Sequence, residues 1–386
     1  MPSRDELLTK LKSILHDHIT ETSTPGLSAA ILTPNACHTL TAGQSNLQTQ
    51  QQIEPFQVFG IGSITKVFTA IVILQLCEEG KLKLSDTVAQ HLSSETYADI
   101  DDTADATIPQ LLGHEAGIDS WEDDPKWITH GRGQALDPQH IWEKTEPLSY
   151  IRRPKRIAPK RGEWYYSNTN YTLLGLIIEK ISQNTAESEI RNRILTPLDL
   201  HDIYLEGFET ARGALPSRYH WATDTFRSTA GICPSFPLIR DDLIDASTSN
   251  LSVEWTAGGM LSSASDLVRF GRALRDGKLL RPESLDVMKK WRATAPGSEA
   301  GRGLFRTKFA GSGGSEYWDG HFGGVLGFTA GLWWAEDGDV VVAVFSNVGT
   351  MHAGSVAGSG AHVIMNTGFL GVARELAEVD GGMLDV

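Results

Sequence analysis

Residues 59–66 read Phe59-Gly60-Ile61-Gly62-Ser63-Ile64-Thr65-Lys66 and lead into the strongly apolar run Val67 to Cys77. This stretch predicts a helix that begins near Ser63, is apolar on nearly every face and stops at Gly80, a residue type suited to the left-handed end of a helix. The run is shorter than the ~20 residues of a membrane span. We therefore expect a core helix in the middle of the protein.

The segments around this helix indicate the fold class. Gly26 to Leu32 predicts a buried strand near the N-terminus. Val325 to Ala335 and Val340 to Ser346 predict two more strands, joined by a hairpin at Glu336-Asp337-Gly338-Asp339. We also expect a first helix over 7–19, a polar turn over 43–52, helices over 171–181 and 265–276, and a last helix over 362–378. This order predicts an α+β fold, in which an antiparallel sheet is flanked by N- and C-terminal helices and carries an inserted, mainly helical domain.

The composition changes in the middle of the chain. From Leu84 to about Arg240, helical segments are broken by loops rich in Pro, Asp and Trp. We expect residues 1–84 and 241–386 to form a discontinuous α/β sheet domain and residues 85–240 to form the mainly helical domain. The active site should then lie at the interface of the two domains.

The charge and the cysteines exclude several classes of protein. The 386 residues carry 34 Lys plus Arg and 48 Asp plus Glu, a formal net charge of −14. This charge argues against a nucleic-acid-binding protein, because neutralising phosphates needs a cluster of basic residues. Cys37, Cys77 and Cys233 are odd in number and widely spaced, so they predict neither a disulfide framework nor a zinc site. The first helix is interrupted by charges and lacks a signal-peptide core. We expect a cytoplasmic protein with no nucleic-acid or membrane partner, and the sequence leaves the oligomeric state open.

Ser63 and Lys66 lie three residues apart, so a helix places them on one face, where they can share a hydrogen bond. Lysine acts as a base near pH 7 only if its pKa falls from about 10.4 by ~3 units, which costs ~4 kcal/mol at about 1.36 kcal/mol per unit. A buried, apolar helix can desolvate the amine to that extent. Ser-x-x-Lys occurs by chance about once or twice in a chain of this length. The context favours a catalytic role, because Gly60 and Gly62 allow close backbone approach and the Ser63 N–H lies at a helix start, suited to an oxyanion.

A second candidate motif is Tyr166-Ser167-Asn168. A phenol beside a lysine can carry a proton, and an Asn amide can both donate and accept hydrogen bonds. The alternative is an ordinary loop with Asn168 or Thr169 as the N-cap of the helix that follows.

A third candidate is Gly320-His321-Phe322-Gly323-Gly324, which precedes the strand expected from Val325. Glycines at a strand edge let a ligand lie against the sheet, where a free N–H can serve as the second oxyanion donor. We expect no metal and no cofactor. His114-Glu115 lacks a second His at the zincin spacing, and Gly60-Ile61-Gly62 lacks the third glycine of a dinucleotide fingerprint.

Taken together and in this order, the three motifs resemble those of the penicillin-recognising serine hydrolases, in the branch of class C β-lactamases, D-alanyl-D-alanine carboxypeptidases, D-amino-acid amidases and related esterases. The similarity extends from about residue 5 to 350. Further blocks that resemble the family are Pro25 to Ser28, Leu111 to Ile118, Gly162 to Glu179 and Ala257 to Leu267. The resemblance implies a β-lactamase/transpeptidase-like fold.

The resemblance also implies roles for the motif residues. Ser63 would be the acylated nucleophile, with Lys66 and Tyr166 as the base system that also protonates the leaving group. Asn168 would bind the acyl-side amide, and the N–H groups of Ser63 and Gly324 would form the oxyanion hole. The roles thus fall on Ser63, Lys66, Tyr166, Asn168, His321, Gly323 and Gly324.

The third motif departs from the family pattern. His321-Phe322-Gly323 replaces Lys-Thr-Gly and removes a fixed cation and a hydroxyl that would meet a substrate carboxylate. This change argues against β-lactamase activity and favours the amidase, esterase and carboxypeptidase members. The Leu111 block also departs, with Gly113 and Glu115-Ala116 where the family usually has Thr-His-Thr-Ser.

Aromatic residues beside the motifs suggest an apolar acyl pocket, although core packing is an equal alternative for each. These pocket candidates are Trp164, Tyr165, Trp318 and Phe322. A substrate with a free α-ammonium needs a carboxylate facing it, and Glu115 and Asp319 are the candidates nearest the motifs.

The sequence therefore predicts a serine hydrolase that forms an acyl-enzyme with a small amide, a D-aminoacyl amide or peptide, or an ester. Alternatives are an acyltransferase that passes the acyl group to an alcohol or amine, a β-lactamase-like hydrolase, and a non-catalytic scaffold. The expected partner is a small-molecule substrate.

Overall fold

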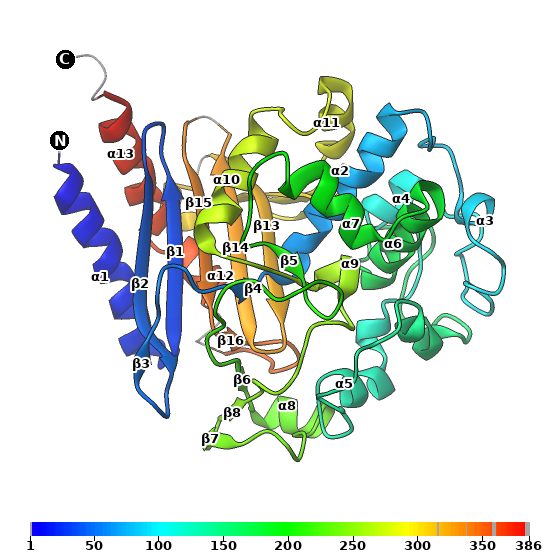
Figure 1. Cartoon of the computed structure of the whole chain (residues 1–386), viewed down its shortest axis with the longest axis horizontal. Coiled ribbons are helices and arrows are strands. Elements are labelled where there is room, and N and C mark those ends of the chain that lie inside the picture. The colour runs from blue at the N-terminus through cyan, green and yellow to red at the C-terminus, as the bar shows by residue number, and fades with distance from the viewer. Residues whose placement is uncertain (1, 315, 337, 357–359, 383–386) are drawn as a thin grey trace.

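The computed structural model describes residues 2–314, 316–336, 338–356 and 360–382. Within this part of the chain, the main sheet has the strand order β10-β11-β12-β13-β14-β15-β1-β2-β3, and its neighbouring strands are antiparallel. The helices α1, α12 and α13 cover one face of the sheet, and α10 and α2 lie on the other (Figure 1). The predicted α+β architecture with terminal helices on the sheet is confirmed.

The strands of this sheet are β1 (Gly26–Leu32), β2 (Cys37–Asn46), β3 (Gln51–Gln52), β10 (Arg292–Ala295), β11 (Ser298–Ala300), β12 (Phe305–Lys308), β13 (Tyr317–Val325), β14 (Phe328–Ala335) and β15 (Val341–Ser346). Shorter strands are β4 (Phe59–Gly60), β5 (Tyr204–Leu205), β6 (Tyr219–Trp221), β7 (Leu238–Arg240), β8 (Leu243–Asp245), β9 (Met260–Ser262) and β16 (Val348–Gly349). The helices are α1 (Arg4–Thr22), α2 (Thr65–Glu78), α3 (Val88–His91), α4 (Ile108–Leu112), α5 (Pro125–Gly131), α6 (Asn168–Ser182), α7 (Ala186–Ile190), α8 (Asp224–Thr229), α9 (Trp255–Gly258), α10 (Ala264–Arg275), α11 (Pro282–Met288), α12 (Ala361–Met365) and α13 (Phe369–Gly382).

The sheet separates two apolar cores. In β15, Val341, Ala343 and Phe345 face the core shared with α2 and α10, whereas Val342 and Val344 face the core under the terminal helices. Successive side chains of a strand point to opposite faces, so a strand that is apolar at every position covers both cores. This explains why β1, β14 and β15 read as continuous apolar runs.

The helix α2 is buried along nearly its whole length, as its composition predicts. It begins at Thr65, and one 3₁₀ turn over Gly62–Ile64 precedes it, so Ser63 lies in this turn rather than in the α-helix. Gly62 has φ +51°, and a Cβ there would meet the Gly324 nitrogen at 2.5 Å. Only glycine therefore allows the turn to lie against β13.

Several predicted boundaries are wrong. The strand expected over 325–335 is two strands, because Leu326 and Gly327 form a turn between β13 and β14. β13 itself was not expected, since its glycines weaken the strand pattern. The turn expected over 43–52 belongs partly to β2, and the last helix is split into α12 and α13. Asp337 of the predicted hairpin lies outside the described residues, but β14 and β15 pair as that hairpin requires.

The middle of the chain contains short helices together with strands. β6 and β7 pair with β8, and β6 also pairs with β16 near the C-terminus. The predicted domain boundary at residue 240 thus falls inside a small sheet, and the division into two domains stays a prediction. Among the residues described, no helix has the length and apolar character needed to cross a membrane.

Candidate active site

Ser63 and Lys66 form the hydrogen-bonded pair that their spacing predicts. The Lys66 Nζ donates to the Ser63 Oγ at 3.0 Å and to the Ala257 carbonyl oxygen at 2.6 Å. Its side chain is fully buried in α2. The Ala257 contact comes from α9, which packs against α2, so a distant segment holds the amine beside the serine.

Burial lowers the pKa of Lys66 well below its usual value, because the interior disfavours the ammonium form. The carboxylates of Glu122 and Glu254 oppose this effect, in that order. The balance still favours release of the proton relative to an exposed lysine. A neutral amine is the form that can accept the serine proton.

Tyr166 lies over this pair from the loop before α6. The Lys66 Nζ lies 4.9 Å from the centre of its ring. Burial raises the pKa of Tyr166, while the nearby Ser63 side chain lowers it by a smaller amount. The phenol therefore stays protonated at neutral pH and is suited to passing on a proton that it receives from a neighbour.

His114 supports Tyr166, a role for which the sequence offered only its place in a family block. The two rings stack with centroids 4.2 Å apart. The Ser167 N–H donates to His114 Nδ1 at 3.0 Å, which leaves the proton of a neutral ring on Nε2. Burial lowers the pKa of His114 far below its usual value, with a smaller contribution from the Lys66 charge. The ring is therefore a neutral support.

Asn168 begins α6, directly after the N-cap residue Ser167. Its side-chain NH₂ group donates to Glu122. Its Oδ1 is buried and has no hydrogen-bond partner among the residues described. Because a buried acceptor without a partner is costly, Asn168 presents an acceptor that a ligand N–H would satisfy.

Glu122 belongs to a buried charge cluster that the sequence analysis did not identify. One Arg132 nitrogen donates to Glu122 and also, at 2.8 Å, to Glu254. The Arg132 and Glu254 side chains are only 1% and 5% exposed. Burial raises the pKa of Glu254, and the Arg132 charge opposes this. Since the three residues come from separate segments, no spacing pattern joins them.

The third motif lies in β13, at an edge that contacts the turn holding Ser63. A Cβ on Gly323 would lie 1.9 Å from the Ile61 carbonyl oxygen, so the two backbones touch. This contact brings the Ser63 turn against Gly323 and Gly324, as the predicted oxyanion pair requires. The oxyanion role itself stays a prediction.

His321 is buried beside the pair, with its Nδ1 against the Phe322 carbonyl oxygen. Burial, with a smaller contribution from the Lys66 charge, lowers the pKa of His321 to about 3. The ring is therefore neutral at physiological pH. It does not restore the positive charge that a lysine would supply at this position.

These residues line a cavity of about 730 Å³, a size typical of small-molecule sites. Predicted residues in its wall are Ser63, Trp164, Tyr165, Tyr166, Asn168, His321, Phe322, Gly323 and Gly324. Residues that the sequence analysis did not identify include Glu122, Asp123, Glu254, Phe305, Trp333, Met351 and His362. The wall is therefore largely aromatic, with an acidic side.

Three predicted pocket residues do not line this cavity. Glu115 pairs with Arg292 outside it. Trp318 is buried in the core beneath the terminal helices, and Asp319 is buried against Arg306 at 2.9 Å and Lys289 at 3.2 Å. Nearness in sequence was misleading here, because the direction of a side chain depends on the pleat and on neighbouring strands.

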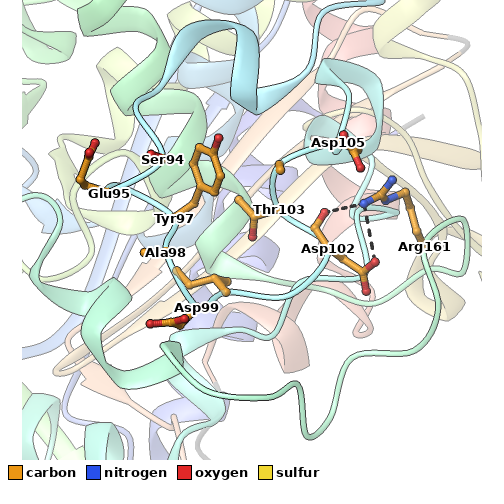
Figure 2. A pocket seen from close by; sticks show the side chains of 11 residues that line it. Ser94, Glu95, Tyr97, Ala98, Asp99, Asp102, Thr103, Asp105 and Arg161 are labelled. Carbon is orange, nitrogen blue, oxygen red and sulfur yellow. Dashed lines mark hydrogen bonds and ion pairs between the residues drawn. The ribbon is translucent and has the colours of Figure 1, made fainter.

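A second hollow of about 570 Å³ lies in the loop between α3 and α4 and contains none of the motif residues (Figure 2). Its wall includes Tyr97, Asp99 and Asp102, and Arg161 donates to the Asp102 carbonyl oxygen at 2.8 Å. Asp102 also forms an ion pair with Lys155. These contacts hold the loop in place. Residues of the three motifs line the cavity of about 730 Å³ instead.

Fold and site together define a β-lactamase/transpeptidase-like protein with a hydrogen-bonded Ser-x-x-Lys pair. Residues 11–360 match the Beta-lactamase family model, and the chain belongs to that family. A penicillin-binding protein of Bacillus subtilis (strain 168) is 28% identical over 298 residues, which are 77% of this chain and 64% of that relative. The chain thus spans just under two thirds of the relative's length.

Two solved structures resemble the whole chain. A D-stereospecific amidohydrolase from Streptomyces sp. has a TM-score of 0.78 and 26% identity, covering 94% of this chain and 97% of its own. The D-amino acid amidase from Ochrobactrum anthropi SV3, in complex with D-phenylalanine, has a TM-score of 0.78, 23% identity, and coverage of 96% and 99%. At that identity, the second likeness concerns the fold alone.

Proposed function

We propose that the protein is a serine hydrolase that cleaves small amides through an acyl-enzyme and prefers acyl groups with a free α-ammonium. The observation that carries this proposal is the Ser63–Lys66 pair in a cavity whose wall also contains Glu122 and the unpartnered Asn168 Oδ1. Nucleophile, base and a cation-binding side thus belong to one site.

In the proposed acylation step, the neutral Lys66 amine accepts the Ser63 proton as Oγ attacks the substrate carbonyl. Two backbone N–H groups, of Ser63 and Gly324, stabilise the oxyanion. The close approach of Gly62 to the Gly324 nitrogen supports this pairing. Tyr166 passes the proton from Lys66 to the leaving nitrogen, since its phenol lies beside both Lys66 and Ser63. The same groups then activate water for deacylation.

The acidic side of the cavity supports the substrate class. Glu122 and Asn168 Oδ1 offer acceptors for an α-ammonium, and these replace the wrong candidates Glu115 and Asp319. The aromatic wall is suited to an apolar side chain. A preference for the D configuration is supported by the Streptomyces enzyme, which is described as D-stereospecific.

β-Lactamase-like hydrolysis is less favoured by the site. A penicillin-type carboxylate needs a cation next to the third motif, and burial keeps His321 neutral there. Acyl transfer to an alcohol or amine uses the same acyl-enzyme, and product analysis with an added alcohol would separate it from hydrolysis.

The test is turnover of D- and L-phenylalaninamide, 4-nitrophenyl acetate and a β-lactam, with intact-mass spectra of the wild type and Ser63→Ala. We expect hydrolysis of the D-amide and a mass adduct, both lost in Ser63→Ala. Cleavage of the ester alone would contradict the substrate class. A lack of any adduct on Ser63 would contradict the enzyme and favour the scaffold alternative.

A further inference from the structure

The charge cluster behind the cavity contains more carboxylates than fixed cations. Arg132 is a permanent cation, and its guanidinium bridges both Glu122 and Glu254. Lys66 is the other cationic group, and it interacts with both carboxylates. Glu254 is tied to Lys66 through α9, because its carbonyl oxygen accepts from the Ala257 N–H at 2.8 Å and the Ala257 carbonyl binds the amine.

Other titratable groups near Lys66 do not change this balance. Burial keeps His114, His321, Tyr166 and Tyr171 neutral at physiological pH, since it lowers the pKa of the histidines and raises that of the tyrosines. On α7, Glu187 pairs with Lys144 and Glu189 with Arg193. On α11, Glu283 and Asp286 are exposed. Asp123, in the same cavity wall, accepts a hydrogen bond from the Tyr165 hydroxyl. The charges that act on the Lys66 amine are those of Glu122 and Glu254, which Arg132 bridges.

The cluster is neutral only when it holds one proton between Lys66 and Glu254. The charges of Arg132 and Glu122 cancel each other. The ammonium with the carboxylate is neutral, and so is the amine with the carboxylic acid. Loss of that proton leaves one buried negative charge without a partner, which a low-dielectric interior strongly disfavours.

We propose that Lys66 and Glu254 share one proton in the free enzyme, and that an ammonium ligand bound at Glu122 displaces this proton to solvent. The bound cation then supplies the positive charge that the proton supplied. Lys66 is left neutral and Glu254 ionised. Binding of a cationic substrate thus puts Lys66 in the neutral form that accepts the Ser63 proton. The inference rests on the proposed function in two respects, that Lys66 is the base and that a substrate ammonium binds at Glu122.

This coupling is reciprocal. If a cation favours loss of the proton, then loss of the proton strengthens binding of the cation by the same factor. Affinity for a cationic ligand should therefore rise with pH through the range in which the shared proton leaves, whereas affinity for a neutral ligand of the same shape should not.

The test is isothermal titration calorimetry of the wild type at pH 7 in two buffers of different ionisation enthalpy. The ligands are D-phenylalaninol, which has no carbonyl to hydrolyse, and 3-phenylpropan-1-ol, which differs only in lacking the ammonium. We expect the amine to release about half to one proton per site and the alcohol to release none.

Two variants sharpen this test. In Glu254→Gln the remaining charges of Arg132 and Glu122 cancel, so Lys66 is already neutral and proton release should fall to near zero. The acid limb of 4-nitrophenyl acetate hydrolysis should also move to lower pH by about one unit, as loss of a nearby carboxylate predicts. The exposed carboxylate of Glu163 lies outside the cavity wall, and Glu163→Gln should behave like the wild type.

Binding of D-phenylalaninol without proton release would overturn the inference and leave the hydrolase proposal intact. Failure of D-phenylalaninol to bind at millimolar concentration would also overturn it. Conversely, proton release by an enzyme that cleaves no amide would support the charge coupling and contradict the proposed substrate class.

Discussion

Two buried carboxylate sites in this protein differ in how their charges balance. Asp319 is fully buried, and it faces two cations, Arg306 and Lys289, which are 14% and 29% exposed. Glu122 and Glu254 share one buried Arg132 and line the cavity. The first site is satisfied by its own neighbours. The second is short of a cation on the side that a ligand reaches, and we propose it as the functional site for that reason.

Replacement of Lys66 should distinguish the two sites most clearly, because Lys66 interacts with Glu122 and Glu254 and not with Asp319. We expect Lys66→Met to reduce kcat for any substrate by about 10³-fold or more, as loss of a general base does. Thermal stability should be maintained, since a buried amine is replaced by an apolar chain of similar length. Steady-state kinetics and a melting curve check both points. Lys289→Met at the Asp319 site is the matched control, and an equal loss of kcat there would contradict the distinction.

Removal of the arginine tests the charge balance directly. Arg132→Met leaves two buried carboxylates without their bridging cation and should lower the free energy of unfolding by about 3–5 kcal/mol. Arg306→Met leaves Lys289 facing the buried Asp319 and should cost less, about 2 kcal/mol, the usual contribution of a hydrogen bond to a charged group. Urea unfolding at pH 7 measures both values. Similar losses in the two variants would show that the sites are equivalent.

The carboxylates themselves should differ in their effect on specificity. Glu122→Gln should lower the ratio of kcat/KM for D-phenylalaninamide to that for 4-nitrophenyl acetate by about 10–100-fold, the usual contribution of a hydrogen bond to a charged group. Asp319→Asn should leave the ratio unaltered, since its side chain does not reach the cavity. Steady-state kinetics with both substrates measures this ratio. A lower ratio in Asp319→Asn would support Asp319, the candidate that the sequence suggested, as the partner of the substrate ammonium.

A smaller effect concerns His321, which lies on β13 two residues after Asp319 and lines the cavity. Its pKa is about 3 in the folded protein because of burial, against about 6.5 when unfolded. Between these values the unfolded chain binds the proton and the folded chain does not. This contribution to stability is therefore lost as the pH falls from about 6.5 towards 3, by about 1.4 kcal/mol per pH unit.

Denaturant unfolding at pH 7, 6 and 5 measures this slope, and His321→Asn should make it shallower. His220, whose pKa burial also lowers to about 3, lies outside the cavity and adds the same trend. An unchanged slope in His321→Asn would show that His321 is already charged in the folded protein.

Much of the sheet was predictable because its central strands are apolar at nearly every position. β1 begins and ends where the sequence indicated, and α10 was predicted to within one residue at each end. β13 was not predictable, since Gly320, Gly323 and Gly324 interrupt its pattern. A Cβ on Gly320 would meet the Leu332 carbonyl oxygen and one on Gly323 the Ile61 carbonyl oxygen, so these two glycines let other backbones approach. These glycines made residues 320–324 recognisable as a motif, but they also weakened the strand pattern, so the strand itself was not predicted.

The sequence by itself determined the Ser63–Lys66 pair, because two side chains three residues apart meet on one helical turn in whatever fold buries that helix. It also indicated Tyr166, Asn168 and His321 through motif order. Only the tertiary structure decided which carboxylates face the nucleophile. Arg132 joins Glu122, 10 residues away, to Glu254, 122 residues away, and such a contact depends on how distant segments pack rather than on any local period.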